Sequence, residues 1–136
     1  MTKKTPRHIG IIPDGNRRWA VEHGMNKQDG YTYGLLPYTT RTPVNGGGIR
    51  LNFLVNYGWE WDLSHMRLDG TPFSSDISRV DLVIRWGGMR RLSGFLPLQS
   101  VYADFYVIDH YWPDFDDHDL TNALVWYATQ DVTLGG

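Results

Sequence analysis

The sequence predicts an α/β fold, with a largely parallel sheet flanked by helices. Two observations lead to this class. Short apolar runs at residues 8–12, 49–56, 80–84 and 103–108 have the length of buried strands. Most of the stretches between them carry helical spacing or glycine-rich turns, and strands that alternate with helices favour a parallel sheet. We expect one domain spanning residues 1–136.

Composition narrows the class of protein. Hydrophobic residues make up 41% of the chain and aromatic residues 14%, which is enough for a packed core. The net charge of −2 argues against nucleic-acid binding. The chain has no cysteine, which excludes disulfides and thiolate metal sites. No apolar run reaches membrane-spanning length and no signal peptide is expected, so we predict a cytoplasmic protein without a membrane span.

The first predicted strand ends in a turn that carries charge. The apolar run 8–12 is followed by Pro13, Asp14 and Gly15, and a helix is expected at residues 18–23 with a stop near Gly24. Free backbone N–H groups at the start of a helix, with arginines beside them, favour phosphate binding. A carboxylate at Asp14 would repel phosphate unless a divalent cation lay between them, which suggests Mg²⁺. The alternative is an ordinary strand–turn–helix with a surface Asp-Gly turn.

The middle of the chain gives weaker signals. Residues 25–48 are rich in Gly, Pro, Thr and Tyr without a sustained period, so we expect a loop that is unusually long for a compact domain. Residues 49–56 alternate as a strand with one covered face. Residues 59–76 are expected to form an irregular, turn-rich connection.

A second basic motif follows the apolar run 80–84. Arg85, Arg90, Arg91 and Ser93 lie within nine residues of one another. Ligands collect at the carboxyl ends of strands in open α/β sheets, so the two basic motifs could hold two phosphorylated groups. The alternative is a solvated basic loop. Asp104, at the next predicted strand, is either a second metal carboxylate or an edge-strand charge.

The last third of the chain predicts three elements. Residues 92–102 have helical spacing, but Pro97 allows only a short or kinked helix. A strand is expected at 103–108 and a turn at 112–115. The clearest helix follows, capped by Asp116 or Asp117 and ending before Gly135. Its expected buried stripe consists of Leu120, Ala123, Leu124 and Tyr127.

Several motifs together resemble the cis-prenyltransferases, the undecaprenyl diphosphate synthase family. The opening signature is matched by Ile12-Pro13-Asp14-Gly15-Asn16-Arg17-Arg18-Trp19-Ala20. The family's strand-end motif is matched by Asn56-Tyr57-Gly58. The C-terminal signature is matched within residues 80–115 by Asp81 to Arg85, Gly87-Gly88, Arg91 to Ser93, Phe95, Tyr102 to Tyr106 and Trp112 to Phe115. The matches cover roughly half of the chain, in the family's order.

The resemblance implies roles for individual residues. Asp14 would hold Mg²⁺ and assist departure of an allylic diphosphate, with Asn16 and Arg18 as its catalytic companions. The substrate-binding residues implied by the resemblance, or suggested by an aromatic face or a family position, are Gly15, Arg17, Trp19, Tyr31, Arg85, Arg91 and Ser93. Of these, Arg85, Arg91 and Ser93 would bind the diphosphate of the second, isopentenyl-type substrate. Asp104 falls where the family usually has a glutamate at the metal.

The chain also departs from the family pattern. The family's central block is absent, with an apparent deletion near residues 36–38. Trp86 replaces a usual threonine, Met89 a usual glutamate, and Tyr31 stands where many members have histidine. Residues 29–31, the doubled arginine and the loss of glutamate at Met89 resemble the lavandulyl-type branch, which joins short allylic units head-to-middle.

The resemblance implies Mg²⁺-dependent prenyl transfer between short isoprenoid diphosphates, of the dimethylallyl, isopentenyl or geranyl type. An allylic diphosphate would ionise and a second C5 diphosphate would attack it, head-to-tail or head-to-middle. A homodimer is also implied, and we expect Leu120, Leu124, Tyr127 and the strand at residues 102–108 to supply apolar surface for the partner. The alternative is a non-catalytic or truncated member that acts as a diphosphate-binding or partner subunit.

Overall fold

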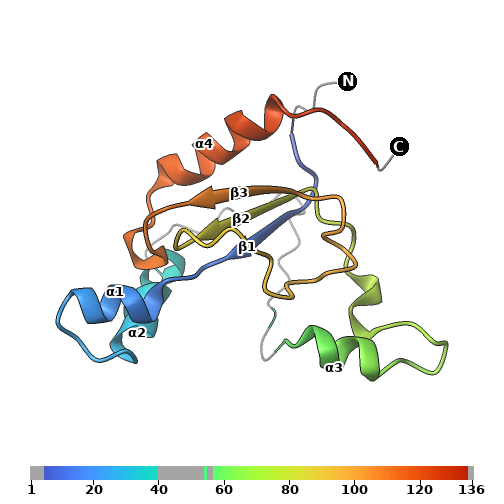
Figure 1. Ribbon diagram of the computed structural model, residues 1–136, viewed down its shortest axis with the longest axis horizontal. Helices are drawn as coiled ribbons and strands as arrows, with labels where there is room; N and C mark the ends of the chain where they lie inside the picture. Colours follow the sequence, from blue (N-terminus) through green and yellow to red (C-terminus); the bar gives the residue numbers. More distant parts are fainter. Residues whose placement is uncertain (1–4, 40–53, 55–56, 135–136) are drawn as a thin grey trace.

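The computed structural model describes residues 5–39, 54 and 57–134 and shows an α/β arrangement around a parallel sheet (Figure 1). Its three strands are β1 (Ile9–Ile12), β2 (Leu82–Trp86) and β3 (Asp104–Ile108), in the order β1-β2-β3. Both pairings are parallel, and Ile12 lies opposite Arg85, which lies opposite Val107. The predicted fold class is therefore confirmed. Of the predicted strand at 49–56, only Leu54 lies within the described residues.

Helices α1 (Asn16–Glu22) and α2 (Asp29–Thr39) gather where β1 ends, whereas α4 (Asp117–Ala128) runs along β3 (Figure 1). Helix α3 (Trp59–Ser64) lies away from the sheet. Two 3₁₀ turns complete the described elements, η1 (Phe73–Asp76) and η2 (Trp112–Asp114). None of the described helices is long and apolar enough to cross a bilayer.

The central strand β2 is buried throughout and sends alternate side chains to two cores. Leu82, Ile84 and Trp86 pack into the core on the side of α4, with Ala123 and Tyr127 among the helix residues that contact them. On the opposite side, a second core contains Val80, Val83 and Leu96. Arg85 alternates with Ile84 and Trp86, so its side chain lies on the face away from α4.

Helix α4 begins with a capping box that also reaches the sheet. Asp116 and Asp119 cap each other's backbone N–H groups, which satisfies donors that the first turn would leave unpaired. The Asp119 carboxylate additionally accepts hydrogen bonds from Trp86 Nε1 at 3.1 Å and His110 Nε2 at 2.7 Å. The cap is therefore at Asp116, one of the two predicted positions, and it ties α4 to the end of β2.

Three sequence predictions about the fold were wrong. The expected loop at 25–48 contains α2, and the expected irregular stretch at 59–76 contains α3 and η1. No helix forms at residues 92–102, because Ser93 (φ 51°) and Leu96 (φ 37°) lie in left-handed backbone conformations that interrupt one. Helix α4 ends at Ala128, before Gly135 as predicted.

Candidate active site

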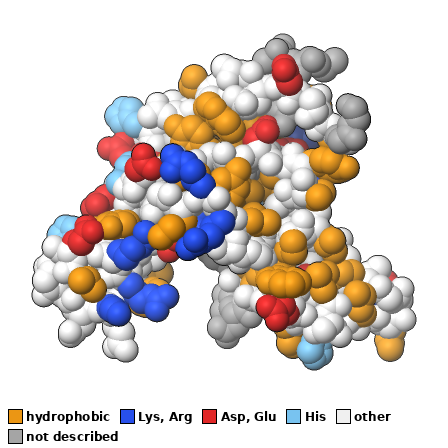
Figure 2. Space-filling model, viewed as in Figure 1, with side chains coloured by type: hydrophobic (Ala, Val, Ile, Leu, Met, Phe, Trp, Pro, Cys, Tyr) orange, Lys and Arg blue, Asp and Glu red, His pale blue; other side chains and the backbone are white. Residues whose placement is uncertain are grey.

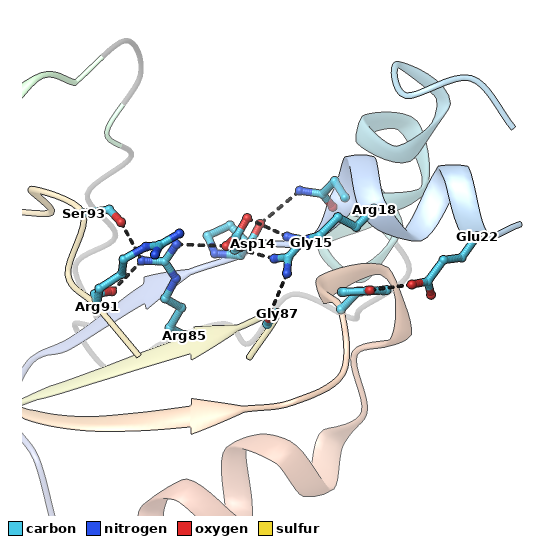
Figure 3. Close-up of polar contacts among 11 residues, drawn as sticks. Asp14, Gly15, Arg18, Glu22, Arg85, Gly87, Arg91 and Ser93 are labelled. Carbon is cyan, nitrogen blue, oxygen red and sulfur yellow. Dashed lines mark hydrogen bonds and ion pairs between the residues drawn. The ribbon is translucent and has the colours of Figure 1, made fainter. Parts of the chain in front are cut away.

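The two basic motifs meet at Asp14, just beyond the carboxyl ends of β1 and β2 (Figure 3). Arg85 Nη2 lies 2.9 Å from Asp14 Oδ2, and Arg18 Nη2 lies 3.2 Å from the same oxygen. The other oxygen, Oδ1, accepts the Gly15 N–H at 2.7 Å. One carboxylate thus joins guanidinium groups from two motifs that are about 70 positions apart in sequence.

The turn after β1 determines where Arg18 points. Gly15 has a φ of 98°, a conformation that suits glycine and lets α1 begin immediately after the strand. Arg18 then lies in the first turn of α1, and its side chain reaches back to Asp14. Its second donor, Nη1, reaches the carbonyl oxygen of Gly87 at 3.0 Å. Arg18 therefore bridges the ends of β1 and β2.

Arg85 is a buried connector, with only 7% of its side chain exposed. Its Nη1 donates to Ser93 Oγ at 3.0 Å and to the carbonyl of Arg91. These bonds hold the 91–93 turn, in which Ser93 has a left-handed backbone conformation, against the sheet. Arg91 and Ser93 themselves remain exposed, so their side chains are accessible to a ligand.

The arginines keep Asp14 ionised. Burial alone would raise the pKa of Asp14, but the hydrogen bonds from Arg85 and from the Gly15 N–H, together with the charges of Arg85 and Arg18, outweigh it. The net result is a pKa below the ordinary value for aspartate. The site therefore contains an ionised carboxylate flanked by the positive charges of Arg85 and Arg18.

An open pocket of about 680 Å³ lies beside this cluster. Figure 2 shows Lys and Arg side chains gathered over α1 and the neighbouring end of the sheet. The pocket is lined by Pro13, Asp14, Gly15, Asn16, Arg17, Arg18, Val21, Glu22, Lys27, Tyr31 and Tyr111. Three of these are cationic and two are anionic, so an anion that entered would meet a net positive wall.

The structure brings most of the predicted residues of the first motif to this pocket, including Arg17 and Tyr31. Asn16 also lines it, and its Nδ2 donates to the carbonyl of Pro13 at 3.0 Å. Among the described residues, no donor reaches the buried Asn16 Oδ1. The Asn16 side chain therefore stabilises the turn through Nδ2, while its Oδ1 accepts no hydrogen bond from the described residues.

Trp19, predicted to contact substrate, is directed elsewhere. Only 7% of it is exposed, and its indole N–H donates to Asp114 Oδ1 at 2.8 Å. Its ring stacks on His23 and packs at 4.8 Å between centroids against Tyr33. Trp19 thus joins α1 to α2 and η2, and the pocket lining does not include it. Trp86, which replaces a usual threonine of the family, is fully buried in the core.

Asp104, the second predicted metal ligand, is not brought to Asp14. It opens β3 and lies opposite Leu82, at the amino end of the sheet. Asp14 follows the carboxyl end of β1. Asp104 starts three residues before the level of Arg85, or about 10 Å along the strand. Within the described chain, Asp104 and Asp14 therefore lie too far apart to share an ion.

Sequence reasoning missed Glu22 and Tyr111, which line the pocket and hydrogen-bond each other at 2.7 Å. A signal for Tyr111 was present, since it closely follows the carboxyl end of β3, beside the strand that carries Arg85. For Glu22 the signal was its position four residues after Arg18, on the same side of α1.

Comparison with known proteins points to one family. Residues 37–135 match the family model described as "Putative undecaprenyl diphosphate synthase". That match covers more than half of the chain and includes β2, β3 and α4. The chain belongs to the undecaprenyl diphosphate synthase family. This confirms the resemblance to cis-prenyltransferases.

Individual synthases extend the match to the first motif. A tritrans,polycis-undecaprenyl-diphosphate synthase (geranylgeranyl-diphosphate specific) of Aeropyrum pernix is 43% identical over 142 residues, covering 99% of this chain and 64% of the relative. A ditrans,polycis-undecaprenyl-diphosphate synthase ((2E,6E)-farnesyl-diphosphate specific) of Yersinia pseudotuberculosis is 31% identical, covering 89% of this chain and 56% of the relative. The chain thus spans less than two thirds of either synthase.

Proposed function

We propose that this chain binds the diphosphate groups of two isoprenoid substrates at neighbouring sites and transfers a prenyl group between them. The observation that carries the proposal is the position of Asp14 between Arg18 and Arg85, at 3.2 and 2.9 Å. Each arginine belongs to a different basic motif. Family membership supplies the class of substrate, and the geometry supplies a junction between the two motifs.

The first diphosphate, on the allylic substrate, fits the pocket beside α1. Gly15, Asn16, Arg17 and Arg18 line it and supply donors that suit phosphate oxygens. The second diphosphate, on the attacking substrate, fits the 91–93 turn. Arg91 and Ser93 are exposed there, and the buried Arg85 holds the turn in place. Arg85 thus contributes to the second site chiefly by supporting Arg91 and Ser93.

The donor set is compatible with Mg²⁺ at Asp14. Among the described residues, no three acidic or histidine side chains converge on a common point, so the protein alone offers no full cage. Mg²⁺ commonly binds through one or two carboxylates plus substrate phosphates, and Asp14 supplies one such carboxylate. When bound there, Mg²⁺ would neutralise charge on the departing diphosphate.

The proposed reaction breaks the bond between C1 and oxygen of the allylic diphosphate. The alkene of the second substrate forms a bond to that carbon, a proton is lost, and inorganic diphosphate leaves. Arg17 and Arg18 stabilise the negative charge that grows on the departing group. Arg91 and Ser93 hold the second substrate so that its alkene faces the reacting carbon.

The carbon-chain length of the allylic substrate must be determined by experiment. The departures from the family pattern favour short units of five or ten carbons. The names of the relatives specify geranylgeranyl and farnesyl diphosphate for those proteins. A second candidate function is that of a diphosphate-binding partner subunit.

Turnover measurements separate the two functions. Purified protein is incubated with labelled isopentenyl diphosphate, Mg²⁺ and allylic diphosphates of five, ten, fifteen and twenty carbons, and products are separated by chain length. A condensation product that disappears in Asp14→Ala supports prenyl transfer. Binding of isopentenyl diphosphate without product, at every allylic length, supports the partner-subunit function instead.

A further inference from the structure

Tyr111 lies at the rim of the first pocket and contacts two charged residues of α1, Arg18 and Glu22. Its hydroxyl donates to Glu22 Oε1 at 2.7 Å. The guanidinium carbon of Arg18 lies 5.1 Å from the centre of its ring, within the range of a cation–π contact. In Figure 3 a dashed line joins Glu22 to a neighbouring ring, and none joins Glu22 to Arg18.

Arg18 and Glu22 would otherwise be natural partners. They lie four residues apart on α1, a spacing at which opposite charges face each other and pair. In this structure Arg18 bonds to Asp14 and to the Gly87 carbonyl instead. The Glu22 carboxylate bonds to the phenol of Tyr111. Tyr111 therefore lies between two oppositely charged groups that would otherwise pair with each other.

The position of Tyr111 is fixed independently of this contact. The next residue, Trp112, donates its backbone N–H to the Asp14 carbonyl at 3.0 Å and its indole N–H to the Gly34 carbonyl. The Tyr111 ring lies directly against Gly15, where an added Cβ would come within 2.6 Å of Tyr111 Cδ1. The backbone of the site thus holds the ring in place, and Arg18 and Glu22 adapt to it.

We propose that Tyr111 is a positioning residue for the diphosphate site: it engages Glu22, and so leaves Arg18 directed at Asp14 and the incoming phosphate. The inference rests on the proposed function for the identity of the ligand. It adds a residue that acts through Arg18 without being required to touch substrate. It also assigns a role to Glu22. When Tyr111 does not hydrogen-bond to Glu22, the Glu22 carboxylate competes for Arg18.

A double-mutant cycle with inorganic diphosphate as the probe tests the inference. Tyr111→Phe removes only the hydroxyl and keeps the ring against Gly15 and Arg18. Glu22 then becomes available to Arg18, and we expect diphosphate affinity to fall about three- to fivefold, the upper part of the range for an exposed ion pair. Glu22→Gln removes the competing charge, so Tyr111→Phe/Glu22→Gln should bind within twofold of Glu22→Gln alone.

The rescue distinguishes competition from simple structural damage. A loss of packing or folding caused by Tyr111→Phe would persist when Glu22 is changed, and affinity would stay low. That outcome, or full affinity in Tyr111→Phe, would overturn the inference. If Tyr111→Phe fails to fold, Tyr111→Leu takes its place in the same cycle. A loss of affinity that Glu22→Gln reverses supports the inference, whereas a loss that persists, or no loss, overturns it.

Failure of the proposed function gives a different result. If the unaltered protein binds no inorganic diphosphate, the ligand assignment is wrong, and the inference that rests on it falls as well. If the unaltered protein binds diphosphate and the cycle shows no coupling between Tyr111 and Glu22, only the positioning role is wrong. Calorimetric titration of all four proteins at one salt concentration gives both answers.

Discussion

Arg85 and Asp14 form an ion pair of 2.9 Å across 71 positions of sequence. The pairing exists because β1 and β2 are parallel neighbours, so the residues after Ile12 arrive beside Arg85. Arg85 is buried and Asp14 is about one-third exposed, so the carboxylate joins the interior of the fold to the open pocket. Fold stability and site chemistry therefore depend on the same contact.

The first prediction concerns the pH dependence of stability. The pKa of Asp14 in the folded protein lies below its ordinary value of 3.8. A lowered pKa means that the ionised group stabilises the fold above the unfolded pKa, and that this contribution is lost as pH falls through the folded pKa. Denaturant unfolding of Asp14→Asn at pH 7 and at pH 3 should show a smaller difference in unfolding free energy than the unaltered protein. An identical difference would contradict the role of Arg85 and Arg18.

The second prediction separates Arg85 from Arg91. Lysine cannot reproduce the planar fork with which Arg85 reaches Asp14, Ser93 and the Arg91 carbonyl. Arg85→Lys should lower the free energy of unfolding by about 1–3 kcal/mol. Arg91→Lys, on an exposed side chain, should change it by less than about 0.5 kcal/mol while weakening diphosphate binding. Equal losses of stability would show that Arg85 is not the connector described above.

The third prediction concerns the turn after β1. Gly15→Ala places a methyl group within 2.6 Å of Tyr111 at a φ of 98°, so both strain and collision oppose it. Gly24 is the matched control, because its φ of 70° carries similar backbone strain but nothing lies within 4 Å of an added Cβ. Thermal melting should show Gly15→Ala to be less stable than Gly24→Ala by at least about 1 kcal/mol. The same stability for both variants would argue against a close contact with Tyr111.

Three of the four predicted strands lie on described residues, and the structure places them within two residues of their predicted bounds. Apolar runs of strand length carried this prediction, most clearly at β2, which is buried throughout. Helix α2 was missed because Gly30 and Gly34 have low helix propensity, so the sequence of this segment does not indicate a helix. In the structure they permit close packing on α1: an added Cβ at Gly30 would lie 1.9 Å from the Asn16 carbonyl oxygen, and one at Gly34 would lie 2.2 Å from Asn16 Oδ1. Local propensity does not contain that tertiary reason.

The site was partly predictable for a similar reason. Asp14, Arg18 and Arg85 follow apolar runs, and the rule that ligands gather at carboxyl ends of parallel strands brings them together. The rule does not say which way each side chain turns. Trp19 packs inward because an indole N–H can reach Asp114, and Asp104 opens its strand at the far end of the sheet. Those outcomes depend on packing and register, which the sequence pattern leaves open.

The fourth prediction concerns assembly. Tyr127 is buried in the chain's own core, and Leu120 and Leu124 are partly buried against it, which reduces the partner surface expected from these residues. Large apolar side chains remain exposed around α3 and η1, namely Trp59, Trp61, Met66, Leu68 and Phe73 (Figure 2). Contiguous exposed apolar surface favours association.

We predict a homodimer in sedimentation velocity at low micromolar concentration, or a loosened monomer that binds hydrophobic dyes. A compact monomer with a sharp cooperative melt and no dye binding would contradict this prediction. Glu60 is exposed on α3, and Glu60→Gln leaves the exposed apolar side chains in place. This variant serves as a control and should not alter the sedimentation coefficient.

The most direct test of the central claim is the effect of Mg²⁺ on inorganic diphosphate binding, measured by calorimetry in the unaltered protein and in Asp14→Asn. Mg²⁺ also binds diphosphate in solution, so the comparison between the two proteins carries the result. We predict that Mg²⁺ tightens binding about tenfold more in the unaltered protein than in Asp14→Asn, or about 1.4 kcal/mol. The same Mg²⁺ effect in both proteins, or no diphosphate binding by the unaltered protein, would contradict a diphosphate and metal site organised around Asp14.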